Sequence, residues 1–192
     1  MFKYIIAVLV LILTITRLLE TVLPDVSKKK GKIYAKWLFY CLLVCGIAIY
    51  ISGVTEFVIS VKEINLPVSI LGIVLLSLKM VLKYRSMKAL GKFWSIQIEL
   101  RKGQTVIREG PYKYVRHPAY ASTIIEVIGG LLLVNAYYSL LLACIIYFPL
   151  IIIRIVLEER NLLGELGDGY MKYQKEVPML LPYKMFNQKA EE

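Results

Sequence analysis

The chain has little of what most catalytic and metal sites are built from. Among its 192 residues there is one histidine, His117, and there are three cysteines. A single histidine has no partner for a metal site, and Cys41, Cys45 and Cys144 show no zinc-like spacing with it. The three cysteines lie inside apolar segments, where they serve as small hydrophobic side chains. We therefore expect neither a bound metal nor a disulfide framework.

The sequence also lacks a dinucleotide fingerprint and is short of acidic side chains. Gly164, Gly167 and Gly169 cluster near the C-terminus but do not follow a strand, which excludes a Rossmann-type cofactor domain. Only 14 Asp and Glu stand against 24 Lys and Arg, so the formal net charge is +10. The cations flank apolar segments rather than forming a separate domain, and we expect no nucleic-acid partner.

Apolar side chains are abundant, at 58% of the chain. A soluble domain of this size would be less apolar, and windows of about 19 residues locate several candidate membrane spans. The predicted fold class is all-α, a polytopic membrane helical bundle with about five transmembrane helices. The expected spans cover residues 2–23, 33–59, 67–82, 119–134 and 138–156.

The distribution of charge predicts how these spans cross the membrane. Lysines and arginines follow the first and third spans, so the positive-inside rule places the N-terminus outside and the C-terminus inside. The first span is too long for a signal-peptide core and is expected to be retained. We expect one integral-membrane domain over residues 1–192, with N-terminal spans in 1–90 and a motif-bearing, cofactor-binding half in 91–192.

Two further regions are expected on the inner face. Within the first, residues 92–100 predict a short strand or an interfacial segment. In the second, a helix continues over 154–166, breaks at 167–169, and is followed by a short helix over 170–177. The link Asn135-Ala136-Tyr137 is so short that the last two spans must form an antiparallel hairpin.

The stretch from Gly110 to Tyr120 is the most informative part of the inner face. Polar side chains at the start of a membrane helix are costly, which favours a functional role. His117 has three interpretations: a cap for the next helix, a titrating acid or base, or a ligand contact. Pro118 restricts the backbone before it, so the loop is expected to be rigid in each case.

Two more charged positions lie in or next to the last spans. Arg154 and Glu158 are four residues apart and share a helix face, so they form either an interfacial ion pair or a functional pair. Arginine is well suited to binding a carboxylate through two parallel hydrogen bonds. Glu126, inside the fourth span, needs a partner, which could be Arg154, Lys79 or a substrate.

Four motifs follow one another along the C-terminal half: Gly110-Pro111-Tyr112-x-x-x-Arg116-His117-Pro118-x-Tyr120, Arg154-x-x-x-Glu158-Glu159, Gly169-Tyr170-x-x-Tyr173 and Pro178-x-x-Leu181-Pro182. Together they resemble the isoprenylcysteine carboxyl methyltransferase family, over about residues 94–183. The compact five-span layout is similar to the prokaryotic type of that family.

The resemblance implies an integral-membrane methyltransferase that uses S-adenosyl-L-methionine and releases S-adenosyl-L-homocysteine. Its acceptor would be the carboxylate of a prenylated cysteine or a similar lipophilic molecule, reached among membrane lipids and without a metal. Arg154 would bind the acceptor carboxylate, and Arg154 and Glu158 would be the catalytic residues. By position, the cofactor contacts would be Gln97, Gln104, Thr105, Val106, Ile107, Tyr112, His117, Pro118, Ala119, Tyr120 and Glu158.

The resemblance also places the cofactor pocket on the cytosolic side, in the cell membrane of a prokaryote or the endoplasmic reticulum of a eukaryote. Related membrane methyltransferases act on phospholipid amines, but an amine acceptor would require carboxylates such as Glu126 or Glu159, and Arg154 favours a carboxylate acceptor. A steroid-reductase-like enzyme using NADPH is a second alternative. A non-enzymatic scaffold or transporter is the weakest, because Glu126 is essentially alone as a polar residue at mid-membrane.

Overall fold

The computed structural model describes residues 32–60, 63–95, 98–100 and 105–182. It confirms the all-α class, with two short strands added. The elements in chain order are β1 (Lys32–Tyr34), α2 (Lys36–Ile59), α3 (Leu66–Leu90), β2 (Ile98–Leu100), α4 (Pro118–Leu133), α5 (Tyr137–Leu142), α6 (Phe148–Leu166) and α7 (Asp168–Glu176). The expected span over 2–23 lies outside the described residues.

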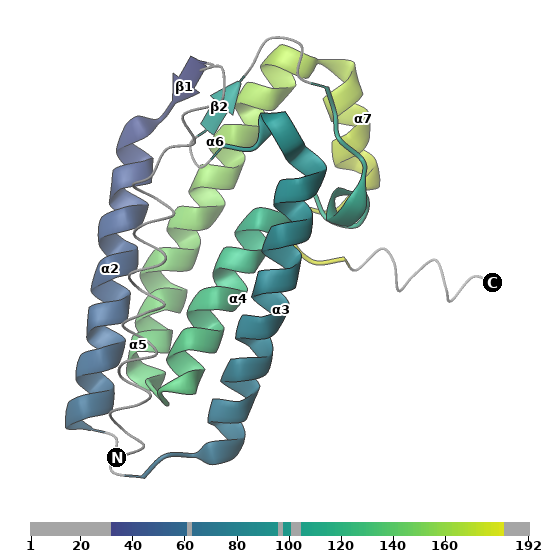
Figure 1. The fold of residues 1–192 in the computed structure, drawn as a ribbon. Coiled ribbons are helices and arrows are strands. Elements are labelled where there is room, and N and C mark those ends of the chain that lie inside the picture. Colours follow the sequence, from purple (N-terminus) through teal and green to yellow (C-terminus); the bar gives the residue numbers. More distant parts are fainter. Residues whose placement is uncertain (1–31, 61–62, 96–97, 101–104, 183–192) are drawn as a thin grey trace.

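The long helices lie side by side as a bundle, with β1, β2 and α7 gathered at one end (Figure 1). Three described stretches are long and apolar enough to cross a membrane: Lys36–Ile59, Leu66–Leu90 and Tyr137–Leu166. The fourth, α4, has 16 residues. At 1.5 Å per residue it is about 24 Å long, which is less than the roughly 30 Å of a bilayer core. The expected span over 119–134 is confirmed as a helix of the same length that begins one residue earlier.

The helix α3 extends eight residues beyond the predicted end of its span. Its first turn is capped by Asn65, whose side chain accepts a hydrogen bond from the backbone of Val68. Hydropathy falls at Lys83, but a helix breaker comes only at Gly91, where φ is 50°. A positive φ is accessible to glycine at little cost, so the helix ends there rather than at the first charged residue.

The second span begins later than predicted, at Lys36 instead of residue 33. The preceding residues form β1, which pairs antiparallel with β2 so that Ile33 is opposite Glu99. Ala35, at φ 47°, separates the strand from the helix. The strand expected within 92–100 is confirmed by β2. The extended conformation of residues 32–34 was missed because the predicted span began at residue 33, where the apolar run leading into the helix starts.

The last span is one helical stretch with a change of winding. A five-residue π-helix, Ala143–Tyr147, joins α5 to α6. Pro149 follows in the first turn of α6 and has no backbone N–H to donate, so a local change in the hydrogen-bond pattern is expected there. The predicted continuation to Leu166 is confirmed, and the break comes at Gly167, at φ 55°. Helix α7 then begins two residues earlier than predicted.

Helices α3 and α4 pack unusually closely. The close approach occurs at glycines, because a Cβ on Gly72 would lie 2.7 Å from the backbone oxygen of Gly129. Further along the same interface, Lys79 Nζ lies 2.7 Å from Glu126 Oε1, and both side chains are buried. Of the alternatives for Glu126, the structure confirms Lys79 as a partner. A buried ion pair of this kind holds two helices in one axial register.

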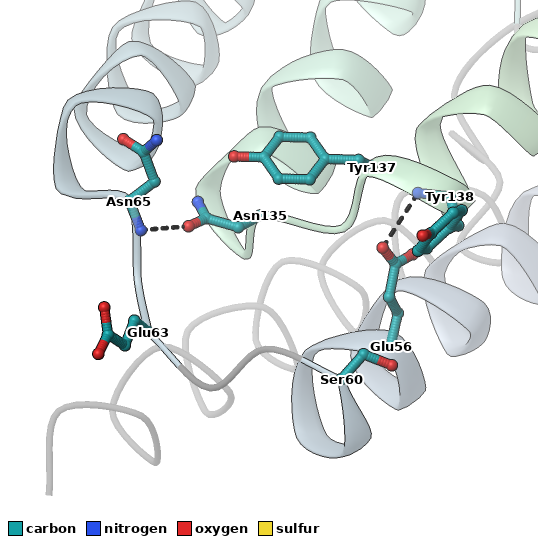
Figure 2. A pocket seen from close by; sticks show the side chains of 7 residues that line it. All are labelled: Glu56, Ser60, Glu63, Asn65, Asn135, Tyr137 and Tyr138. Carbon is teal, nitrogen blue, oxygen red and sulfur yellow. Dashed lines mark hydrogen bonds between the residues drawn. The ribbon is translucent and has the colours of Figure 1, made fainter.

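The opposite end of the bundle contains a network of polar contacts and a pocket. The predicted tight link between the last two spans is confirmed, with Asn135 at φ 54°. Figure 2 shows Asn135 pointing toward the backbone N of Asn65, at 2.6 Å, and Glu56 pointing toward the backbone N of Tyr138, at 3.0 Å. The pocket has a volume of about 310 Å³, and its lining residues are Glu56, Ser60, Glu63, Asn65, Asn135, Tyr137 and Tyr138.

The glycine contact between α3 and α4 yields a stability prediction. We expect Gly72→Ala to lower the free energy of unfolding by about 1–3 kcal/mol, because its new methyl group would lie against backbone atoms that cannot move aside. Chemical unfolding in detergent micelles measures this. The control is Gly164→Ala in α6, where a Cβ would meet no described atom within 4 Å. It should be neutral or stabilising by up to about 1 kcal/mol, and equal effects of the two variants would contradict the prediction.

Candidate functional site

The end of the bundle where α7 lies brings together the loop before α4, the end of α6, α7 itself and the segment that follows it. His117 precedes α4, and Pro118 occupies the first turn of that helix and is fully buried. Within the described structure the His117 side chain does not cap α4; its Nε2 lies 2.8 Å from Glu159 Oε1. His117 is thus the N-cap residue of α4, as the capping interpretation requires, but its side chain bonds to a carboxylate on α6 instead of capping the helix.

Glu159 is the centre of this contact. Its Oε1 accepts a hydrogen bond from Arg116 Nε at 2.7 Å, and its Oε2 accepts one from Gln174 Nε2 at 2.9 Å. The Arg116 and Glu159 side chains are each 10% exposed. A carboxylate that accepts several charge-assisted or amide hydrogen bonds in a buried position fixes all the elements that supply the donors.

Arg116 extends the same contact to the C-terminal segment. Its Nη1 donates to the backbone oxygens of Gln174, at 2.8 Å, and Val177, at the C-terminal end of α7. The backbone N–H groups of Arg116 and His117 donate to Pro178 O at 2.9 Å and to Met179 O at 3.0 Å. The motif residues from two distant parts of the chain are thus bonded directly to each other.

A second chain of hydrogen bonds lies beside the first. Arg154 Nε donates to the Tyr120 hydroxyl at 2.9 Å, and that hydroxyl donates to Glu158 Oε2 at 2.5 Å. The expected common face of Arg154 and Glu158 is confirmed, since Tyr120 contacts both. Arg154 is 6% exposed, whereas Glu158 is half-buried. A buried guanidinium and a more accessible carboxylate therefore lie on either side of one phenol.

The segment before the loop packs on α7. Val106 lies against the buried cluster of Tyr170, Tyr173 and Val177. The Tyr173 hydroxyl donates to the backbone oxygen of Tyr112 at 2.6 Å. Burial raises the pKa of Tyr173 to about 12, so the phenol keeps its proton at neutral pH and remains a donor.

The remaining predicted cofactor contacts are distributed unevenly. Thr105 is exposed, Ile107 is half-buried and Tyr112 is buried. Ala119 is half-buried, and its oxygen accepts a hydrogen bond from Ser122 Oγ at 2.7 Å. Gln97 and Gln104 lie outside the described residues. Among the described residues, no group of three or more His, Cys, Asp or Glu side chains is placed to hold a metal ion.

Sequence reasoning missed the two residues that organise this site. Arg116 and Glu159 belong to the motifs, but the family resemblance implied no cofactor contact for either. Each is adjacent in sequence to a residue that did receive one, His117 and Glu158. The available signal was a charge of opposite sign in each of the two motifs, and such charges need each other as partners once they are buried.

Comparisons with known proteins agree with the motifs. Residues 70–164 match the model of the isoprenylcysteine carboxyl methyltransferase family. The protein named YpbQ of Bacillus subtilis is 29% identical over 136 residues, which cover 70% of this chain and 80% of that protein. A protein-S-isoprenylcysteine O-methyltransferase of Schizosaccharomyces pombe is 35% identical over 81 residues, 42% of this chain and 34% of that enzyme.

A third relative has a different named acceptor. Methanethiol S-methyltransferase 1 of Bradyrhizobium diazoefficiens is 34% identical over 73 residues, which cover 38% of this chain and 25% of that enzyme. The chain therefore spans about a third or less of the two relatives named as methyltransferases.

The Arg116–Glu159 contact yields a second stability prediction. We expect Glu159→Ala to lower the free energy of unfolding by about 3–5 kcal/mol, because it leaves a buried guanidinium without its carboxylate. The double variant Arg116→Met, Glu159→Leu should lose less, since no unpaired charge remains. The control is Glu176→Gln, whose partner Arg108 is 43% exposed, at a cost below about 1 kcal/mol. Chemical unfolding in detergent micelles distinguishes these outcomes, and equal losses for Glu159→Ala and Glu176→Gln would contradict the assigned role.

Proposed function

The chain belongs to the isoprenylcysteine carboxyl methyltransferase family, and from this premise we propose that it is a membrane methyltransferase using S-adenosyl-L-methionine. Its acceptor is the carboxylate of a lipophilic molecule such as a prenylated cysteine. The observation that carries the proposal is the series Arg154, Tyr120 and Glu158, which places a buried cation next to a carboxylate at the inner end of the bundle.

The chemistry of the described residues fits the cofactor. S-adenosyl-L-methionine supplies a methyl group on a positively charged sulfur, together with an ammonium group and ribose hydroxyls that seek acceptors. Glu158 is half-buried and is an acceptor of the required kind. Val106 and Ile107 are both half-buried and apolar, and Val106 lies against α7. We assign Glu158 to a polar group of the cofactor, with the predicted set around His117 and Tyr112 forming the walls.

The acceptor is assigned to Arg154. A planar guanidinium binds a carboxylate through parallel hydrogen bonds, so it can orient the acceptor for in-line attack on the methyl group. A carboxylate is already ionised at neutral pH, so this reaction requires no general base. The protein's contribution is alignment and exclusion of water, to which the 6% exposure of Arg154 is suited.

The role of His117 follows from the same reasoning. Its Nε2 is held by Glu159, and the methyl transfer to a carboxylate leaves no proton for it to remove. We assign His117 to binding and positioning, with its ring 5.7 Å from that of Tyr120. We place the whole site on the cytosolic side, because the lysines and arginines flank this end of the spans.

The cofactor assignment is tested by direct binding. We expect isothermal titration of the purified protein in detergent to detect S-adenosyl-L-homocysteine and not NADPH. Preferential binding of NADPH would favour a reductase and overturn the proposal. A methyl-transfer assay over prenylcysteines, fatty acids, phospholipids and methanethiol then identifies the acceptor, with the methyl ester of a prenylcysteine as the expected product. Transfer to the amine or thiol alone would contradict the carboxylate assignment.

The division of roles between Arg154 and Glu158 is tested by substitution. We expect Arg154→Ala to lower methyl transfer about 100-fold through loss of acceptor alignment, while S-adenosyl-L-homocysteine affinity is retained. Glu158→Ala should weaken S-adenosyl-L-homocysteine binding at least about tenfold. Arg160→Ala is the matched control, since Arg160 is exposed on the same helix. Near-normal turnover by Arg154→Ala would contradict the role assigned to Arg154.

A further inference from the structure

The helix α2 contributes to the surroundings of Arg154, although it carries none of the motifs. The family match begins at residue 70, after α2 has ended at Ile59. The structure nevertheless brings Phe39, in the first turn of α2, next to the guanidinium on α6. The Arg154 Cζ lies 5.8 Å from the centre of the Phe39 ring and 5.6 Å from the centre of the Tyr120 ring.

Both rings are held in place by neighbouring contacts. Tyr120 is fixed by its hydroxyl, which bonds to Arg154 and Glu158. Phe39 follows Leu38, which is fully buried in the same apolar cluster as Ile151 and Ile155 of α6. The packing of α2 on α6 therefore fixes the backbone of Phe39 at the level of Arg154. Phe39 itself is half-buried, and its ring meets that of Tyr40 edge-on at 5.4 Å.

An aromatic ring affects a buried arginine in two ways. The electron-rich face attracts the cation, with an interaction that is strongest when water is excluded. The N–H groups of a guanidinium lie in its own plane, so contact with a ring does not prevent hydrogen bonds to a carboxylate. A ring next to Arg154 therefore restricts the orientation of the guanidinium without competing for its N–H groups.

We propose that Phe39 is a positioning residue for the acceptor: with Tyr120 it sets the orientation of Arg154, so that α2 forms one wall of the acceptor site. This inference rests on the proposed function, in which Arg154 binds a carboxylate. It also limits the class of acceptor. The neighbouring side chains Trp37 and Tyr40 are 60% and 58% exposed on a helix that is long and apolar enough to cross a membrane. The favoured acceptor carries its carboxylate close to an apolar group that lies against this part of α2.

The test compares acceptor kinetics with cofactor binding. Phe39→Leu should lower kcat/KM for a prenylcysteine about tenfold, mainly through a higher acceptor KM, because the guanidinium loses its aromatic contact. Phe39→Trp should retain activity, since it restores an aromatic face. Isothermal titration with S-adenosyl-L-homocysteine should give the same affinity for both variants and for the natural chain. Tyr84→Leu is the control: it removes an exposed aromatic from α3, outside the proposed acceptor wall, and should leave kcat/KM unchanged.

The outcomes separate the inference from the proposed function. If the natural chain methylates a carboxylate acceptor and Phe39→Leu does so with the same kcat/KM, the role assigned to Phe39 is wrong and the proposed function stands. Equal losses in acceptor kinetics and S-adenosyl-L-homocysteine affinity would show a merely structural role and also overturn the inference. If the natural chain methylates no carboxylate, both fail together. Should Phe39→Leu not fold, Phe39→Met carries the same test, because it keeps side-chain length without an aromatic face.

Discussion

The site depends on the buried carboxylate of Glu159. It joins the loop before α4, through Arg116 and His117, to α7, through Gln174. Removing either charge would leave the other buried without compensation, which costs several kcal/mol, so the elements cannot separate cheaply. Glu158 comes one residue earlier on the same helix. Successive residues of an α-helix point about 100° apart, so the two neighbouring carboxylates serve two different sides of the site.

The start of α4 links these two sides. His117 contacts Glu159, and Tyr120, three residues later, contacts Glu158 and Arg154. Residues three apart lie on nearly the same helix face, so one turn of α4 reaches both carboxylates of α6. Pro118 stands between them in the first turn and restricts the backbone. This accounts for the occurrence of the histidine, proline and tyrosine together, and none of the three is assigned a proton transfer.

Much of this arrangement was readable from the sequence, because it depends on local spacing. Hydropathy located the described spans, and the four-residue separation of Arg154 and Glu158 predicted a shared face. Pairings between distant segments were not readable in this way. Arg116 lies 43 residues from Glu159, and no periodicity relates them. The extension of α3 to Leu90 was missed because hydropathy indicates only which residues can lie in the membrane. The helix itself continues until Gly91, which adopts a non-helical backbone conformation.

The packing of α3 on α4 also determines where the side chains of the site lie. Lys79 and Glu126 form a buried ion pair between α3 and α4, and Glu126 is six residues after Tyr120. A slip of one residue along α4 would move Tyr120 by about 1.5 Å, enough to break its 2.9 Å hydrogen bond with Arg154. The same slip would separate two buried charges, which is costly in an apolar bundle. The ion pair and the close glycine packing at Gly72 thus hold the phenol at the height where it reaches both residues of α6. A site whose task is alignment needs its framework to be this stiff, because small displacements of the aligning groups reduce the rate steeply.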